Sequence, residues 1–181
     1  MRKARAAFLF ASRRLIIQAA MRTKSRTLIA IFWIGLVAGT LDIADNLIFN
    51  AFRGITPPMV FRFIASGLIG ADAARSYGLT SIALGGAIHF FIALFWTIVF
   101  YLLSRKLDFL IRRPVLGGLL YGAFVYLFMN FVIVPLSRVP PRPAAATLPA
   151  RINAVLAILL FIGLTISLLT RRYLSRPSGS H

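Results

Sequence analysis

The chain has 181 residues, of which 59% are hydrophobic and only 14% are charged. A water-soluble unit of this length could not bury so much apolar surface in a single core, which excludes an ordinary soluble domain. The charge is one-sided, with 21 Lys and Arg against four Asp and Glu, giving a net charge of +17. The absence of cysteine excludes disulfides, thiolate catalysis and cysteine-ligated metal sites.

The basic residues lie at the ends of long apolar runs rather than on one continuous basic face. This placement is typical of the flanks of membrane spans, so we expect anionic phospholipid, and not nucleic acid, as the partner of this charge. Residues 1–26 contain eight Lys and Arg and are expected to form a basic cytoplasmic arm lying on the lipid surface. Arg13 and Arg14 interrupt the apolar stretch of this arm, which argues against a cleavable signal.

Four segments are apolar over the length of about 20 residues that crosses a hydrocarbon core of about 30 Å. We expect them to be helices, because a helix satisfies its own backbone hydrogen bonds in lipid. The predicted fold class is an all-α, integral membrane four-helix bundle. Its membrane domain covers residues 27–174, a flexible tail follows at 175–181, and the spans are 27–50, 79–103, 114–134 and 152–170.

The connections between the spans differ in basic charge. Residues 1–26, 104–113 and 171–181 together contain 15 Lys and Arg. The connections 51–78 and 135–151 together contain six. The positive-inside rule therefore predicts that both termini are cytoplasmic.

The first outer connection includes an apolar run that is too short to span. Thr56 followed by Pro57 is typical of a helix start. Residues 59–70 are apolar apart from Arg62 and Ser66. We expect a short helix here that lies in the interface or enters the membrane and returns.

Prolines mark the second outer connection. Because proline lacks an N–H and cannot continue a helical hydrogen-bond pattern, Pro135 is expected to end the third span. The prolines that follow are expected to keep the connection extended: Pro140, Pro141, Pro143 and Pro149.

Polar residues occur inside the predicted spans. Carboxylates in lipid are costly and face protein or water, so they mark a candidate functional site. With a helical rise of 1.5 Å, Asp42 and Asp45 lie about 21 and 25 Å from the inner boundary, on one face that we expect to point inward. Residues of other helices reach compatible depths, and the predicted intramembrane polar cluster is Asp42, Asp45, Asn46, His89, Asn130 and, at the rim, Arg62.

These residues are compatible with three functions. The first is transport of a small solute, or the handling of protons, through the polar cluster. The second is a structural or accessory role, in which the chain packs with a partner or anionic lipid. Asp42 and Asp45 then only bond neighbouring helices or pair with Arg53 or Arg62. The third and least favoured is an intramembrane serine hydrolase with Ser66 and His89 as a dyad, since no GxSxG motif surrounds the serine. No cofactor and no metal are expected.

Glycines spaced four residues apart are expected to be close-packing positions between helices, namely Gly35, Gly39, Gly118 and Gly122. Four helices make a thin bundle, so a transport function predicts a homo-oligomer, whereas the structural role predicts a membrane-protein partner.

Several short motifs follow one another along residues 30–170, namely Gly35-Leu-Val-Ala-Gly39, His89-Phe90, Gly117-Gly-Leu-Leu-Tyr-Gly122, Met129-Asn130 and Val134-Pro135-Leu136-Ser137. Their order resembles the layout of the YagU-like family of small bacterial inner-membrane proteins. The resemblance implies a bacterial inner membrane and a four-span fold, and it implies no particular activity.

Overall fold

The structure, a computed structural model, describes the backbone of residues 2–140 and 147–175, and side chains from residue 24 onward within these ranges. The described residues are helical apart from turns and short connections, which confirms the predicted all-α fold. The elements in chain order are α1 (Arg2–Ala51), α2 (Pro57–Ile69), α3 (Ala71–Ser76), α4 (Leu79–Ser104), α5 (Phe109–Arg112), α6 (Pro114–Phe128), the π-helical η1 (Met129–Ile133), α7 (Val134–Leu136), α8 (Leu148–Ala157), the π-helical η2 (Ile158–Leu164) and α9 (Thr165–Leu174).

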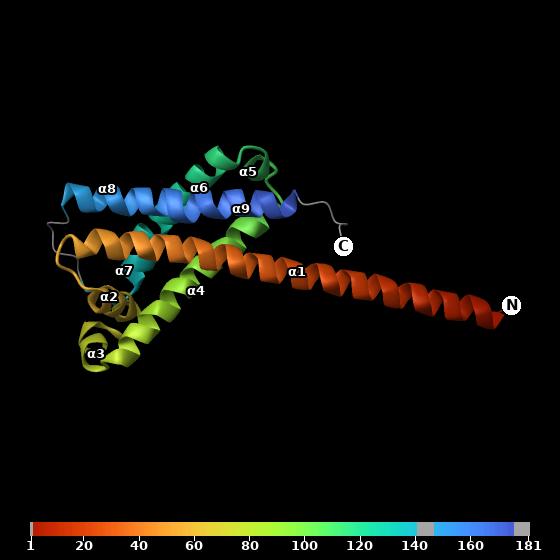
Figure 1. Cartoon of the computed structure of the whole chain (residues 1–181), viewed down its shortest axis with the longest axis horizontal. Helices are drawn as coiled ribbons and strands as arrows, with labels where there is room; N and C mark the ends of the chain where they lie inside the picture. The colour runs from red at the N-terminus through yellow and green to blue at the C-terminus, as the bar shows by residue number, and fades with distance from the viewer. Residues whose placement is uncertain (1, 141–146, 176–181) are drawn as a thin grey trace.

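Four stretches are long and apolar enough to cross a membrane, so the chain is a multi-pass membrane protein. They are Lys24–Ala51, Leu79–Ser104, Pro114–Leu136 and Leu148–Leu174. The third consists of α6, η1 and α7, and the fourth of α8, η2 and α9. The start of α1 and the end of α9 point toward one end of the bundle (Figure 1), while α2 and α3 lie at the opposite end, called the α2 end below.

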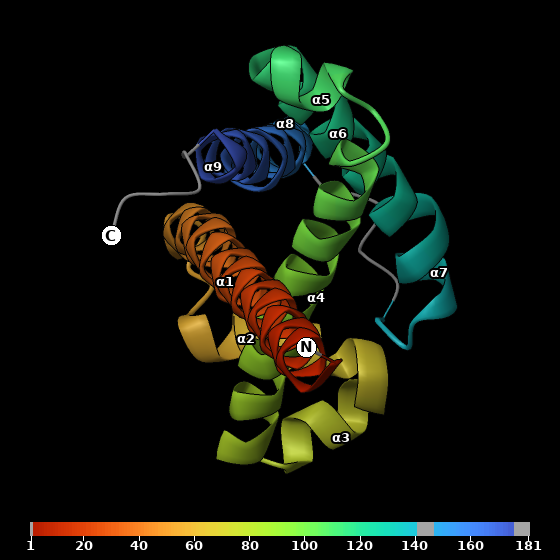
Figure 2. The same ribbon diagram turned by 90° about the vertical axis from the view of Figure 1, so that its right-hand side faces the viewer.

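The N-terminal arm is not a separate element. Its backbone continues without a break into the first span as one helix of 50 residues, about 75 Å long at 1.5 Å per residue. The residues before Lys24 project beyond the other helices (Figures 1 and 2). The contact of this arm with the lipid surface stays a prediction.

The prolines between the third and fourth spans differ from expectation at both ends of this connection. The third span continues through Pro135 and ends at Leu136, two residues later than the predicted end at residue 134. The π-helical η1 precedes this proline, and a wider helical turn accommodates a ring that cannot donate a backbone hydrogen bond. Pro149 lies in the first turn of α8 rather than in an extended segment. The N–H groups of a first helical turn have no partner within the helix, so the missing N–H of proline costs nothing there. Pro141 and Pro143 lie outside the described residues.

The short helix predicted between the first and second spans is present as α2. It starts at Pro57 with Thr56 in the N-cap position, although the threonine side chain makes no capping hydrogen bond. Gly70 and Gly78 have φ values of 85° and 54°, a left-handed conformation that favours glycine and lets the chain turn sharply around α3 into α4.

Close contacts with α4 and with the residues after α7 fix the position of α2. The backbone of Phe61 lies so close to Gly85 of α4 that no Cβ atom would fit there. On the other side, the Arg138 N–H donates a hydrogen bond of 2.9 Å to the Gly67 carbonyl. The α2 helix is therefore a packed part of the bundle end, joined to two different spans.

The most intimate helix contact joins α6 to η2. Gly118 and Gly122 face Gly163 so closely that a Cβ atom on Gly163 would lie 2.7 Å from the Gly122 Cα atom and against the Gly118 carbonyl oxygen. Backbone-to-backbone packing of this kind needs small residues on both sides and is a main source of helix association in lipid.

Aromatic side chains fill the space between α4 and α6. The rings of Trp96 and Phe100 pack edge-on against Tyr121, with centroids 6.3 and 4.9 Å away. The Tyr121 hydroxyl donates a hydrogen bond of 2.5 Å to the Trp96 carbonyl, which satisfies the phenol inside an apolar core.

Candidate functional site

The candidate site begins where α1 crosses α4. A Cβ atom on Gly39 would lie 3.0 Å from both the Ala93 methyl group and the Phe90 ring, so glycine brings the two helices together here. This approach lets His89 of α4 reach the Gly39 carbonyl, with 2.8 Å between Nε2 and the oxygen. A carbonyl only accepts, so Nε2 carries a proton and Nδ1 is the nitrogen that exchanges one.

Asp42 lies one helical turn beyond Gly39, beside this histidine. It is half-buried and within electrostatic reach of both His89 and Asp45. Both ion pairs in the described part of the chain are exposed and outside the spans, Arg75–Asp72 and Arg112–Asp108. Asp42 is therefore a carboxylate inside a span that interacts electrostatically with a histidine and with a second carboxylate, and it forms no ion pair with an arginine of the described residues.

Asp45 faces a different neighbour. Its carboxylate accepts a hydrogen bond of 3.0 Å from the Asn153 side chain of α8. The three-residue offset from Asp42 rotates Asp45 far enough around α1 to leave α4 and meet the fourth span. The two carboxylates thus connect α1 to two different helices.

Asn153 was missed by sequence reasoning. It follows Arg151 near the start of the fourth span, where polar residues are expected simply as boundary residues. The same holds for Thr27 and Tyr173, whose hydroxyls are 3.0 Å apart and join α1 to α9 near the opposite end of the bundle. The signal that could have found these residues is a polar side chain within one turn of a span end, opposite another in the antiparallel partner.

Two members of the predicted polar cluster lie apart from it. The expected inward orientation is wrong for Asn46, which is exposed and accepts a hydrogen bond of 3.0 Å from the Asn50 side chain on the same helix. Asn130 lies in η1 and donates to the Tyr126 carbonyl one turn earlier, at 2.8 Å. Within the described residues, no hydrogen bond or ion pair joins Asn130 to Asp42 or His89.

Arg62 lies on α2, and in the described part of the chain it forms no ion pair with Asp42 or Asp45. Arg53, the other arginine considered as a partner, packs over the Phe49 ring instead, 5.8 Å from its centroid. The structure therefore brings together Asp42, Asp45 and His89, adds Asn153, and leaves both arginines outside.

The hydrolase geometry is absent from the described residues. The Ser66 hydroxyl donates 2.6 Å to the Phe63 carbonyl within α2, while His89 is bonded to Gly39. A serine nucleophile needs a hydrogen bond to its base, and no such bond joins these two side chains. Nor do the described residues contain three or more His, Asp or Glu side chains placed to hold a metal ion.

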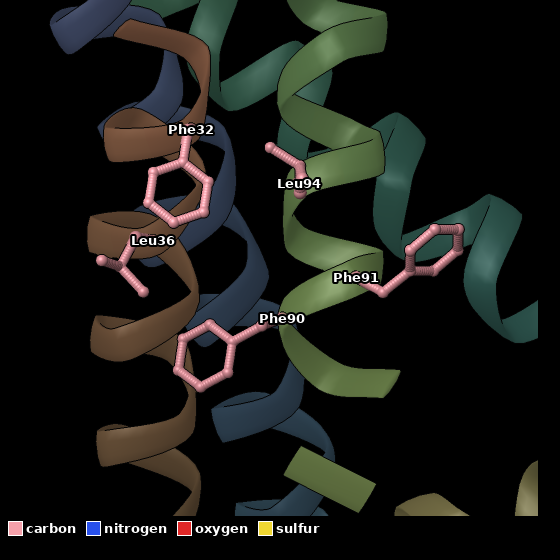
Figure 3. A pocket seen from close by; sticks show the side chains of 5 residues that line it. All are labelled: Phe32, Leu36, Phe90, Phe91 and Leu94. Carbon is pink, nitrogen blue, oxygen red and sulfur yellow. The ribbon is translucent and has the colours of Figure 1, made fainter. Parts of the chain in front are cut away.

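An apolar groove of about 150 Å³ lies between α1 and α4, on the surface of the bundle. In Figure 3 the Phe90 ring points toward α1 and Phe91 points away from it. The lining of the groove contains no polar side chain and consists of Phe32, Leu36, Phe90, Phe91 and Leu94. The groove is therefore a surface for apolar chains and is separate in its chemistry from the polar site.

No family model matches the sequence, and no match was found to a curated protein or to a solved structure. The resemblance to the YagU-like family accordingly stays a prediction from short motifs.

Proposed function

We propose that this protein handles protons, or a small solute coupled to them, through Asp42 and His89 inside the membrane. The observation that carries the proposal is the half-buried carboxylate within a span beside a histidine whose Nε2 is held by the Gly39 carbonyl. Ionisable residues at such depth are costly, and those that persist commonly serve ion or proton pathways.

The arrangement supplies the parts of a two-site proton relay. The Gly39 carbonyl orients the imidazole and leaves Nδ1 to bind and release a proton. Because Asp42 and His89 interact electrostatically in a medium of low dielectric constant, protonation of one changes the charge felt by the other. The Asn153 hydrogen bond holds the second carboxylate, Asp45, in place beside them.

Proton flux into proteoliposomes that enclose a pH-sensitive dye tests this proposal. We expect wild-type protein to dissipate an imposed pH gradient faster than empty liposomes do. Asp42→Asn and His89→Gln should reduce the rate to that of empty liposomes, because each removes one proton-binding group. Asp108→Asn is the matched control, since it neutralises an exposed carboxylate outside the spans and should leave the flux unchanged. Equal flux from wild type and Asp42→Asn would rule the relay out.

We further propose that the membrane is a bacterial inner membrane, with both termini cytoplasmic and the α2 end outside. Support comes from the excess of Lys and Arg at the termini and from the YagU-like motif order. Anionic phospholipid is then the partner of the N-terminal arm. A reporter fused after residue 181, active only in the periplasm, should be inactive, and a positive signal would reverse the orientation.

A structural role is the second candidate, favoured by the hydrogen bond between Asp45 and Asn153, which joins α1 to α8 without any chemistry. On this alternative the chain packs against a membrane-protein partner, whereas the relay fits a homo-oligomer. Co-purification of a stoichiometric partner in mild detergent would support the structural role, and a single homo-oligomeric species would count against it.

A further inference from the structure

Arg62 differs in burial from the other described arginines at the α2 end. Arg62 is half-buried, whereas the other described arginines of this end are exposed, namely Arg53, Arg75, Arg138 and Arg151. Its Nε atom is buried and has no hydrogen-bond partner. Among the exposed arginines, Arg75 pairs with Asp72 and Arg53 packs on an aromatic ring.

The Nε–H group of Arg62 is buried without an acceptor, while the side chain as a whole is half-buried. A buried donor without an acceptor costs about 1–3 kcal/mol, and more when the group is charged. The described part of the fold provides no carboxylate for Arg62, since Asp72 is paired with Arg75 and the two carboxylates of α1 make no ion pair. The Arg62 guanidinium makes no ion pair within the described residues and is therefore available to an acceptor from outside the fold.

The surroundings of Arg62 indicate what that acceptor is. The side chains of Met59 and Phe63, which lie three residues before and one after it on α2, are 56% and 39% exposed. A helix that presents apolar side chains beside one arginine, at the end of a membrane bundle, lies at the level where acyl chains meet phosphates. The guanidinium fork matches phosphate oxygens and binds them through two parallel hydrogen bonds.

We propose that Arg62 binds a phosphate group at the α2 end, supplied by the headgroup of a membrane phospholipid. The contacts of α2 keep the arginine in place for this role, through the Phe61 backbone on Gly85 and the Arg138 N–H on the Gly67 carbonyl. The site is independent of the proton relay, because it uses a different helix and a different ligand.

Thermal unfolding in detergent, followed by the fluorescence of the two tryptophans, tests the proposal. Added dioleoylphosphatidylglycerol should raise the wild-type Tm. Arg62→Gln should show no lipid-dependent rise, and without lipid its Tm should equal or exceed that of wild type, because the unpaired charge is gone. Arg62→Lys keeps the charge but loses the fork, so we expect about ten-fold weaker lipid binding. Arg75→Gln removes an exposed arginine and should respond to lipid like wild type.

Parallel titrations distinguish the source of the phosphate. Inorganic phosphate alone should not raise the wild-type Tm; an equal rise would assign the site to a soluble phosphate and overturn the lipid. An Arg62→Gln variant that gains as much from lipid as wild type would overturn the site itself. So would a variant that is destabilised without lipid, since the guanidinium would then have a partner within the fold. If Arg62→Gln does not fold, lipid retention by wild type and Arg62→Lys in native mass spectrometry decides the question.

Discussion

Two of the helix interfaces in this bundle differ in their polar content. Between α6 and η2, glycine backbones touch directly, with Gly163 set against Gly118 and Gly122. Between α1 and its neighbours, half-buried polar side chains lie in the seam, with His89 on the Gly39 carbonyl and Asp45 on Asn153. Glycine also brings α1 close to α4 at Gly39, so close packing occurs in both interfaces, and of these two only the α1 interface contains carboxylates. Because ionisable groups are costly inside a membrane span, this difference supports the proposed proton relay.

Solvent access distinguishes the two interfaces most sharply. The chain has no native cysteine, so single cysteines report one position each. We expect Asp42→Cys and His89→Cys to react in intact cells with a membrane-impermeant thiol reagent, because a relay must be open to outer water. Val125→Cys, 2% exposed on α6, should stay unlabelled. If the cysteines at positions 42 and 89 stay unlabelled in folded protein, the interface between α1 and its neighbours is also closed to water, which would favour the structural role.

The glycine interface should be the less tolerant of added volume. In Gly163→Ala the new methyl group meets backbone atoms that cannot rotate away, and we expect a loss of about 3 kcal/mol in unfolding free energy. Gly86→Ala is the matched control, because its methyl group would meet only the edge of the Phe61 ring at 3.9 Å. That substitution should be neutral or stabilising by about 0.5 kcal/mol. Unfolding in graded sodium dodecyl sulfate measures both, and equal effects would refute the glycine contact.

The hydrogen bond between Asn153 and Asp45, which joins α8 to α1, should contribute little to stability. A double-mutant cycle with Asp45→Ala and Asn153→Ala should give a coupling free energy of about 0.6 kcal/mol, the usual size of a side-chain bond between membrane helices. A coupling above about 2 kcal/mol would exceed the range for such bonds and make this pair a principal stabilising contact.

Much of the architecture could be predicted because hydrophobic length is a local property. Runs of about 20 apolar residues imply membrane helices whatever their neighbours are, and the four spans lie where they were expected to within a few residues. The errors occurred at the ends. Pro149 begins a helix instead of extending a loop, and Pro135 lies inside the last turn of its span. Proline is accepted in both a first helical turn and a loop, so local sequence does not distinguish the two.

The polar site was only half predictable for a different reason. Composition within a span identifies Asp42 and Asp45 as unusual, but the partner of each depends on how the helices rotate against one another. Three residues of offset turn Asp45 away from α4 toward Asn153. On the third span, Asn130 is bonded to its own helix. Depth along the membrane follows from counting residues; the angle around each helix axis does not.

The sequence by itself therefore determined that the chain crosses a membrane, how many spans it has and how basic charge differs between their connections. It could do so because the transfer of each residue between water and lipid depends mainly on that residue's own hydrophobicity and charge. Tertiary structure alone decided which polar groups meet. The close approach at Gly39 brings His89 beside Asp42, and the packing of α2 leaves Arg62 half-buried without a partner. Those outcomes depend on backbone distances between segments far apart in the chain, and such distances are set by the packing of the whole bundle.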